Sequence, residues 1–411
     1  VRSAGDHRAP GGGPGVDVNV QSPATADARA IEAASTIAVY PQLPFVPVRA
    51  AGCDLFTAAG RRILDLYGGH AVACLGYDHP DLTRAIEQQA RQLLFQSNAV
   101  ALDVRAEAAR KLVEIAPASL DRAFFVNSGA EANENALRMA ITATGRGRVL
   151  AVTGGFHGRT AAAAAVTWNS GKWYGFPQKP FDVDFIPRDH LAAAADMIDD
   201  DVAAVIAEPV QGVAGAFDLS GDFLRTLRAE THRHGALLIT DEVQSGMGRT
   251  GSFFACSRYD VEPDILTAAK SLAGGLPAGA VLVTNELARH FGPGSLGTTF
   301  GGGPLAAAAT STVIDVIRRD ELLANVSARE AEIRHRCIVG PVTAIQGKGL
   351  LLGLVCDRPA VEVRDALLER DILTGTSSDP RVLRILAPLV LESQHVDQLH
   401  AALASIPSAN Q

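Results

Sequence analysis

Several features that assign proteins to common classes are missing from this sequence. Its 411 residues include 37 Lys and Arg against 45 Asp and Glu, which gives a formal net charge of −8 at pH 7. Because nucleic-acid binding requires a basic face, this acidic balance argues against a nucleic-acid partner. No apolar run approaches the roughly 20 residues that span a bilayer, and the polar N-terminal segment has no apolar stretch of the secretory type. We therefore predict no membrane segment and no secretory signal.

Cysteine is also scarce, and its pattern argues against two common uses. The chain has five cysteines, an odd number, and no two of them form a Cys-x-x-Cys motif. This pattern favours reduced thiols in a cytoplasmic protein over a disulfide framework or a zinc site. We predict no metal site. The cysteines are Cys53, Cys74, Cys256, Cys337 and Cys356.

The residues that are present indicate a globular protein of more than one domain. Hydrophobic residues make up 47% of the chain and charged residues 20%, as in soluble globular proteins. Residues 1–27 are rich in Gly, Pro, Ala and Asp without a hydrophobic period, which predicts a disordered segment. Residues 28–74 follow it, with an extended arm over 39–48 and a small hairpin around Ala59-Gly60.

Residues 75–305 show the rhythm of an α/β domain. Helical periodicity begins at Pro80-Asp81, and a second helix is expected over about 104–116. Beyond it, short apolar runs alternate with helical stretches, which predicts a parallel sheet with helices on both faces. The expected strands end at Val126, Val152, Ile186, Ala207 and Ile239, with another near 264–268.

Residues 306–411 have a different pattern, which predicts a separate α+β unit. We expect this unit to pack with the N-terminal hairpin, so that both chain ends build one small domain. Helices are expected over about 304–318, 320–338, 360–370 and 394–405, and short strands near 342–346, 350–355 and 382–386.

The segment Phe125–Asn133 is the first of five that carry candidate chemistry. A strand ends there, Gly129 turns the chain, and a helix begins. This places free backbone N–H groups and the positive end of the helix at Ser128–Ala130, which suits a phosphate group. Taken alone, the segment also fits an ordinary strand-to-helix turn.

Three further segments have both a functional and a simpler interpretation. Phe156, in Gly155–Thr160, offers either an aromatic platform beside an arginine or a plain loop. Asp241 stands at the carboxyl end of a buried strand, where open α/β sheets bind ligands, although helix capping is the commoner use of such an aspartate. Thr298 and Thr299 lie among glycines and suit either a phosphate or a turn.

Lys270 is the fifth candidate, in a chain where only five of the 37 basic residues are lysines. It alone follows directly after an apolar strand, whereas the other lysines lie on a polar helix face or in loops. A desolvated amine has a lowered pKa and favours imine formation, and a structural salt bridge is the alternative.

Together these segments supply a phosphate cup, a stacking ring, an acid for a ring nitrogen and a lysine for an imine, as pyridoxal phosphate requires. Their order and spacing resemble the class III aminotransferases of pyridoxal-phosphate fold type I, in the acetylornithine, succinylornithine and ornithine aminotransferase branch. The resemblance runs from about Val39 to Leu399. It implies a large domain with a mainly parallel seven-stranded sheet between helices, a small α+β domain from both chain ends, and a homodimer with shared active sites. The matching motifs begin at Asn127, Phe156, Glu208, Asp241 and Pro263.

The resemblance also implies roles for the candidate residues. Lys270 would form the imine with the cofactor and, once released, carry a proton, while Asp241 would keep the ring nitrogen protonated. The other implied cofactor contacts are Gln244 at the ring hydroxyl, Phe156 and Val243 on the ring faces, Ser128, Gly129 and Ala130 at the phosphate, and Thr299 with Thr298 at the phosphate of the neighbouring subunit.

Two arginines complete the site that the resemblance implies. Arg159 matches the position that grips a substrate carboxylate distant from the reacting amine. Arg384 matches the position that binds the α-carboxylate of glutamate. Because each guanidinium binds a carboxylate bidentately, the two would suit a five-carbon dicarboxylate.

Two positions depart from the family pattern. Ornithine-type relatives carry a glutamate that covers the second arginine, and this chain has Val213 there. Relatives usually read Gly-Gly-Asn-Pro where this chain has Gly303 in place of the asparagine. The missing glutamate predicts another way of hiding the charge of Arg384, or a wider tolerance for acidic groups.

The predicted reaction is transfer of the terminal amine of N2-acetyl-L-ornithine, or of N-succinylornithine, to 2-oxoglutarate, giving the semialdehyde and glutamate in arginine biosynthesis. One alternative is another ω-aminotransferase, acting on ornithine, 4-aminobutyrate or a carrier-bound lysine precursor. The second alternative is an aminomutase of the same fold, which would need no 2-oxo acid. A non-catalytic binding module is a third, which the intact Lys270, Asp241 and Phe156 argue against.

Overall fold

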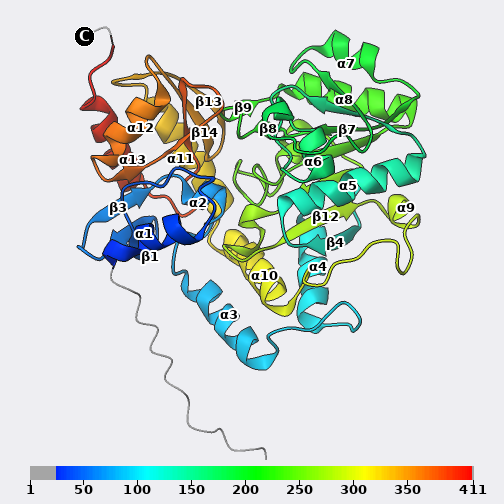
Figure 1. The fold of residues 1–411 in the computed structure, drawn as a ribbon, viewed down its shortest axis with the longest axis horizontal. Helices are drawn as coiled ribbons and strands as arrows, with labels where there is room; N and C mark the ends of the chain where they lie inside the picture. Colours follow the sequence, from blue (N-terminus) through cyan, green and yellow to red (C-terminus); the bar gives the residue numbers. More distant parts are fainter. Residues whose placement is uncertain (1–24, 410–411) are drawn as a thin grey trace, which may run out of the picture.

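The computed structural model describes residues 25–409, which form two units (Figure 1). One unit is built around a large sheet from the middle of the chain. In the other, the blue N-terminal strands lie beside the orange and red C-terminal elements. The predicted disordered segment, residues 1–27, lies outside the described residues as far as residue 24, and its last three residues begin helix α1 (Thr25–Ser35).

The large sheet has seven strands, and six of them run in the same direction. Only the second strand in spatial order, β12, is antiparallel to both of its neighbours. The predicted fold, an α/β domain with a mainly parallel seven-stranded sheet, is confirmed. In spatial order the strands are β4 (Arg122–Val126), β12 (Gly279–Val283), β11 (Ile265–Ala268), β10 (Leu237–Asp241), β7 (Val202–Ala207), β5 (Arg148–Val152) and β6 (Asp182–Ile186).

Helices cover both faces of this sheet, because successive residues of a strand point to opposite sides. Ile206 belongs to one apolar cluster together with Leu137 of α5. Its neighbour Val205 belongs to another, together with Phe223 of α8. Strands buried on both sides form continuous apolar runs, which is why they were readable in the sequence. The helices of this unit are α3 (Pro80–Gln92), α4 (Asp103–Ile115), α5 (Gly129–Thr144), α6 (Ala161–Ala165), α7 (Leu191–Met197), α8 (Gly221–His234), α9 (Asn285–Ala288) and α10 (Pro304–Arg319), with the 3₁₀ turns η1 (Ser170–Lys172), η2 (Ala255–Tyr259) and η3 (Lys270–Ala273).

The small unit combines two sheets of four strands with three helices. Strand β3 pairs in parallel with β15, which joins residues 62–65 to residues 372–373. Both ends of the chain therefore build this unit, although the domain boundaries at residues 75 and 305 stay a prediction. The sheets are β1 (Pro47–Ala51), β2 (Asp54–Thr57), β3 (Arg62–Asp65) and β15 (Ile372–Leu373), and β13 (Val342–Lys348), β14 (Leu351–Cys356), β17 (Val382–Ile385) and β16 (Gly375–Thr376); the helices are α11 (Leu322–Arg336), α12 (Ala360–Leu368) and α13 (Ser393–Ala404).

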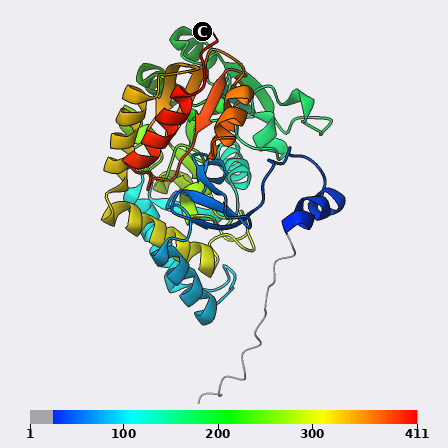
Figure 2. The same ribbon diagram turned by 90° about the vertical axis from the view of Figure 1, so that its left-hand side faces the viewer.

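Three short elements follow strands of the two units and lie near the cavity that is described in the next subsection. Helix α2 (Gly68–Ala71) follows β3, and the hairpin of β8 (Val210–Gln211) and β9 (Phe217–Asp218) follows β7. Helix α1 stands away from the body of the protein, linked by the arm that precedes β1 (Figure 2). No helix within residues 25–409 is long and apolar enough to cross a bilayer. The five cysteines are all buried as free thiols.

Candidate active site

The predicted site residues gather where parallel strands end at one edge of the large sheet. The loops that follow β4, β5, β7, β10 and β11 line a single cavity of about 880 Å³. Open α/β sheets bind ligands at this edge, and the volume is that of a small-molecule site. Ten of the predicted residues line it: Ser128, Gly129, Ala130, Phe156, Arg159, Asp241, Val243, Gln244, Lys270 and Arg384.

Thr298 and Thr299 are the two predicted residues that do not line this cavity. The Thr298 hydroxyl accepts hydrogen bonds from the Asn127 side-chain amide at 3.3 Å and from the Gly301 backbone N–H at 3.0 Å. It thus lies beside the loop between β4 and α5 of its own chain. Their expected role, contact with the phosphate of the neighbouring subunit, stays a prediction.

The start of α5 has the geometry of an anion site. The Ser128 hydroxyl caps the helix by accepting from the Glu131 N–H at 3.1 Å. Among residues 25–409, no acceptor is bonded to the N–H groups of Gly129 and Ala130. Gly129 has to be a glycine here, because a Cβ would lie 2.6 Å from Val243 Cγ1. Two free backbone donors at a helix N-terminus fit the phosphate of the cofactor.

Asp241 is buried, with 2% of its surface exposed, and is held by three donors. Its Oδ2 accepts from Asn133 Nδ2 at 2.7 Å and from His157 Nδ1 at 2.8 Å, and its Oδ1 accepts from the Val243 N–H at 3.0 Å. The Thr267 hydroxyl in turn donates to Asn133 Oδ1 at 2.7 Å. Hydrogen bonds from three donors fix the orientation of the carboxylate. Asp241 therefore presents a fixed negative charge at the end of β10.

Sequence reasoning assigned no role to Asn133 or His157. Both lie inside the motifs that predicted the cofactor site, and that position was the only signal in the sequence. Their contact with Asp241 joins residues from α5, from the loop after β5 and from β10, so it becomes visible only in the folded chain.

Lys270 begins η3 in a strained backbone conformation. Its φ of 47° lies in the left-handed region, which costs a residue with a side chain about 1–3 kcal/mol. Burial lowers the pKa of its amine, and the carboxylates of Asp241 and Glu208 oppose that shift. The strain is compatible with a position fixed by function, and the lowered pKa favours the neutral amine needed for imine chemistry.

Glu208 is a second buried acid that sequence reasoning left without a role. Its Oε1 accepts from the Phe156 N–H at 2.7 Å, and its Oε2 accepts from the Gly212 N–H at 3.1 Å. Burial and the charge of Asp241 raise its pKa to about 7. Glu208 therefore ties the loop that carries Phe156, the predicted stacking ring, to the loop before Val213.

Gln244 places an unpaired side-chain oxygen on the wall of the cavity. Its side chain is 8% exposed, and its Oε1 has no hydrogen-bond partner within residues 25–409. A Cβ on Gly212 would lie 1.8 Å from that oxygen, so glycine makes the space that the amide occupies. Buried polar atoms are normally bonded, and an orphan on a cavity wall fits a bound partner. With Phe156 and Val243 on the same walls, the residues present fit pyridoxal phosphate.

The two predicted carboxylate-binding arginines differ in exposure. Arg159 is exposed, 3.5 Å from the Tyr40 hydroxyl and 5.8 Å from the ring centroids of Tyr40 and Trp173. Arg384 is 7% exposed, and burial lowers its pKa. Both line the cavity that contains Lys270, as does Val213, so a single substrate is able to reach all of them.

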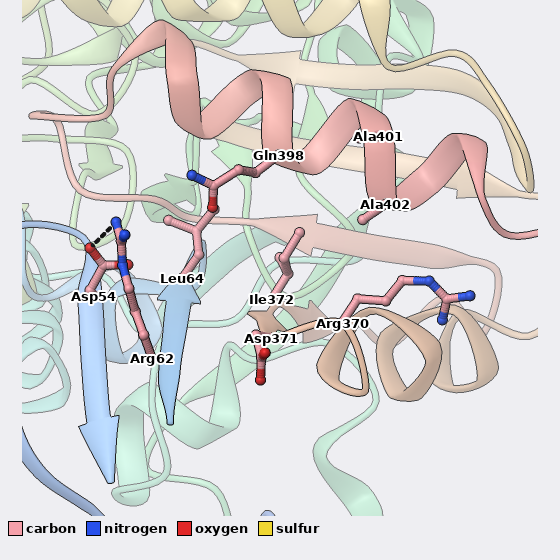
Figure 3. Close-up of a pocket in the computed structure, with 9 residues that line it drawn as sticks. All are labelled: Asp54, Arg62, Leu64, Arg370, Asp371, Ile372, Gln398, Ala401 and Ala402. Carbon is pink, nitrogen blue, oxygen red and sulfur yellow. Dashed lines mark hydrogen bonds and ion pairs between the residues drawn. The ribbon is translucent and has the colours of Figure 1, made fainter. Parts of the chain in front are cut away.

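A second cavity, of about 310 Å³, lies in the small unit and contains none of the predicted residues (Figure 3). Asp54 and Arg62 form an ion pair of 2.8 Å at one side of it, below Gln398 of α13. The Arg370 guanidinium points away from that pair and donates to the Ser405 hydroxyl. Ten of the predicted cofactor and substrate residues therefore line the larger cavity, and none lines this one.

A lysine and a bonded carboxylate at the strand ends of a mainly parallel seven-stranded sheet define a pyridoxal-phosphate-dependent enzyme of fold type I. A family model described as Aminotransferase class-III matches residues 37–406. The chain belongs to this family, and the predicted resemblance is confirmed. An enzyme of this family takes an amino donor and a 2-oxo acid as its substrates.

Several relatives are similar over most of their length. The chain is 39% identical to an acetylornithine aminotransferase of Methanopyrus kandleri, over 90% of this chain and 95% of the relative. It is 40% identical to an acetylornithine aminotransferase of Corynebacterium efficiens, over 89% and 93%. It is 36% identical to a [LysW]-aminoadipate semialdehyde transaminase of Deinococcus radiodurans, over 90% and 87%.

Solved structures share the fold. An ornithine aminotransferase from Toxoplasma gondii superposes with a TM-score of 0.87 at 27% identity, covering 93% of this chain and 95% of that one. An S-selective transaminase from Arthrobacter gives a TM-score of 0.80 at 26% identity, covering 88% and 92%.

The Asp241 network yields a first prediction, on the variant Asn133→Ala. This change removes a donor to Asp241 and leaves buried polar groups unpaired, which costs about 1–3 kcal/mol. We expect a lower thermal midpoint and weaker retention of pyridoxal phosphate, measured by differential scanning calorimetry and by dialysis. The control is Asn135→Ala, which loses only a bond to the Glu131 carbonyl on the same helix. Equal behaviour of the two variants would contradict the assignment.

Proposed function

We propose that this chain transfers the terminal amine of N2-acetyl-L-ornithine, or of its N-succinyl analogue, to 2-oxoglutarate. One observation carries the proposal: Arg159, Arg384 and Lys270 all line the same cavity at the edge of the large sheet. Two guanidinium groups suit a five-carbon dicarboxylate, and an acylated α-amine carries no charge that Arg159 would repel. The acetylornithine aminotransferases at 39% and 40% identity support the same donor.

Pyridoxal phosphate, when bound, supplies an aldehyde for imine formation and a ring that withdraws electrons. The residues around it have separate tasks. Lys270 supplies the amine, and its lowered pKa leaves that amine able to take up and release a proton at Nζ. Asp241 holds its negative charge at the edge of the sheet, where it would keep the ring nitrogen protonated.

The phosphate and ring contacts would orient the cofactor against Lys270. Gly129 and Ala130 offer their free N–H groups, and the side chain of Gln244, whose Oε1 is unpaired, lines the same cavity and would bind the ring hydroxyl. The backbone N–H of Phe156 donates to Glu208, and this bond holds the loop that places the phenyl ring beside the proposed cofactor position. Orientation of this kind lowers the entropic part of the barrier.

A carrier-bound lysine precursor is a second candidate donor. It is favoured by the [LysW]-aminoadipate semialdehyde transaminase, which matches 90% of this chain at 36% identity. The exposed position of Arg159 leaves that end of the cavity open to a large substrate. Comparing kcat/KM for N2-acetylornithine with that for the carrier-bound amine separates the two donors.

The proposal includes a cytoplasmic homodimer with shared active sites. Phe95 and Phe300 are 43% and 64% exposed, and their rings contact each other in a tilted arrangement with centroids 5.2 Å apart. Phe300 directly follows Thr299, so an apolar patch adjoins the threonines expected to reach the neighbouring phosphate. Exposed aromatic pairs of this kind are typical of interfaces. The five free thiols support a reducing compartment.

Lys270→Ala tests the catalytic assignment. Without the amine there is no imine and no proton carrier, so we expect turnover to fall by about 10⁴-fold or more. The assay is formation of glutamate from N2-acetylornithine and 2-oxoglutarate, with Lys179→Ala in an exposed loop as the control. Retained turnover together with an unchanged visible cofactor band would refute the role of Lys270.

Arg384→Ala tests the carboxylate assignment. Loss of a charge-assisted contact should raise the KM for 2-oxoglutarate by about 10- to 100-fold. The KM for the amine donor should change by less than about threefold, because the donor's carboxylate is assigned to Arg159. Steady-state kinetics with each substrate varied in turn measures the split, and equal effects on both constants would contradict the assigned role.

Phe300→Asp tests the shared site. A charge in the patch should dissociate the dimer and weaken cofactor binding, because Thr298 and Thr299 then no longer reach the other subunit. Sedimentation velocity and pyridoxal-phosphate titration measure the two effects. Val361→Asp, at an exposed apolar position on α12, is the control. A wild-type chain that is fully active as a monomer would rule the shared site out.

A further inference from the structure

Arg384 is a buried cation without an acidic partner. It is 7% exposed, and among residues 25–409 it forms no salt bridge; the more distant carboxylate of Glu208 only opposes the lowering of its pKa by burial. Its Nε donates to the Thr376 carbonyl at 2.7 Å, its NH1 to the Gly212 carbonyl at 3.3 Å, and its NH2 to the Tyr67 hydroxyl at 2.7 Å. Buried charges are usually paired, so this neutral cage is unusual.

The cage leaves the guanidinium free to bind an anion. Arg384 has five N–H groups, and three are engaged by these neutral acceptors. One N–H group remains free on each of the two terminal nitrogens. A carboxylate accepts two such N–H groups, one at each oxygen, in a bidentate contact. No anion has to be displaced first, since Val213 is the residue next to Gly212 and carries no charge.

Tyr67 is fixed by contacts with His70 and with strand β16. Its hydroxyl lies 3.1 Å from His70 Nδ1, and the two rings contact each other in a tilted arrangement with centroids 4.6 Å apart. Its ring also lies against β16, because a Cβ on Gly375 would be 1.9 Å from Tyr67 Cε2. The next residue of that strand is Thr376, whose carbonyl accepts from Arg384. The same short strand therefore contacts both the phenol ring of Tyr67 and the guanidinium of Arg384 and fixes their relative positions.

The hydrogen bonds run in one direction from Arg384 to His70. Because Arg384 donates to the Tyr67 oxygen, the Tyr67 proton is free to be donated to His70 Nδ1. Partial burial lowers the pKa of His70, and the positive charges of Arg384 and Lys270 lower it further, which favours the neutral ring that is able to accept. Burial also raises the pKa of Tyr67, which keeps the phenol protonated.

The turn that presents His70 is strained. His70 and Ala71 have φ values of 65° and 64°, in the left-handed region that residues with side chains avoid. Asp65 holds the turn by accepting from the N–H groups of Tyr67 at 2.7 Å and Gly68 at 2.9 Å. Strain that the surroundings maintain tends to occur where a side chain has a functional position.

We propose that Tyr67, oriented by His70, takes the place of an acidic lid over Arg384. It fixes the guanidinium for the carboxylate of the oxo acid without neutralising its charge, which makes Tyr67 a specificity-determining positioning residue. The inference rests on the proposed function for the identity of that carboxylate. It has one direct consequence: the resting holoenzyme binds a five-carbon dicarboxylate that cannot react, such as glutarate.

The test is titration calorimetry of glutarate into the holoenzyme of matched variants. Tyr67→Phe keeps the ring and removes the hydroxyl, and we expect the Kd to rise about tenfold, as for loss of a bond that orients a charged group. Tyr259→Phe removes a hydroxyl from another half-buried tyrosine, which is bonded to Asp218 away from the cavity, and should stay within about twofold of wild type.

Two further variants distinguish positioning from general damage. Val213→Glu adds the acidic lid, so it should itself weaken glutarate binding, and Tyr67→Phe in that background should change the Kd by less than about twofold. His70→Asn keeps an acceptor near the Nδ1 position and tolerates the left-handed backbone, so it should bind more tightly than His70→Ala. In turnover, Tyr67→Phe should raise the KM for 2-oxoglutarate while kcat and the KM for the donor change little.

Three results would overturn the inference. They are unchanged glutarate binding in a folded Tyr67→Phe variant, equal loss of affinity for donor and glutarate, and full additivity of the Tyr67 and Val213 changes. Failure of the proposed function gives a different result. A chain that does not accept N2-acetylornithine, but whose glutarate affinity depends on Tyr67 and Arg384, would refute the donor and support the neutral lid.

Discussion

The buried carboxylate of Asp241 is the charge on which the arrangement of the site depends. Three donors from separate segments, Asn133, His157 and the backbone of Val243, converge on it. This convergence requires the starts and ends of several elements to meet at one sheet edge, which parallel strands provide. Lys270 lies at the same edge, where the charge of Asp241 partly offsets the effect of burial on the pKa of the amine.

Much of the fold was predictable because its strands are buried on both faces and therefore read as short apolar runs. The β7 strand, Val202–Ala207, is the clearest case, with every residue buried. The antiparallel strand β12 was not predicted, because Gly279–Val283 follows a Gly/Pro-rich turn and interrupts the strand–helix alternation. Contacts across the sheet, such as Asn133 with Asp241, have no local pattern in the sequence. The roles of Glu208, His157 and Tyr67 were missed for that reason.

The environment of Arg384 shows how the fold accommodates a buried charge when the acidic side chain expected at position 213 is absent. The sequence indicated that Val213 leaves the arginine without an acidic cover, and it left open how the charge is accommodated. The structure places two backbone carbonyls and the Tyr67 phenol around the guanidinium. Tyr67 and Arg384 are 317 residues apart in the chain, so their bond depends on the small unit being built from both ends.

The central claim is that this cavity holds pyridoxal phosphate at Lys270 and accepts the terminal amine of an N-acylated ornithine. The most direct measurement is the visible spectrum of the purified holoenzyme before and after N2-acetyl-L-ornithine is added without any oxo acid. The account predicts loss of the visible cofactor band, with about one semialdehyde formed per active site. A protein that cannot be loaded with pyridoxal phosphate, or a loaded protein whose band this amine leaves unchanged, would contradict it.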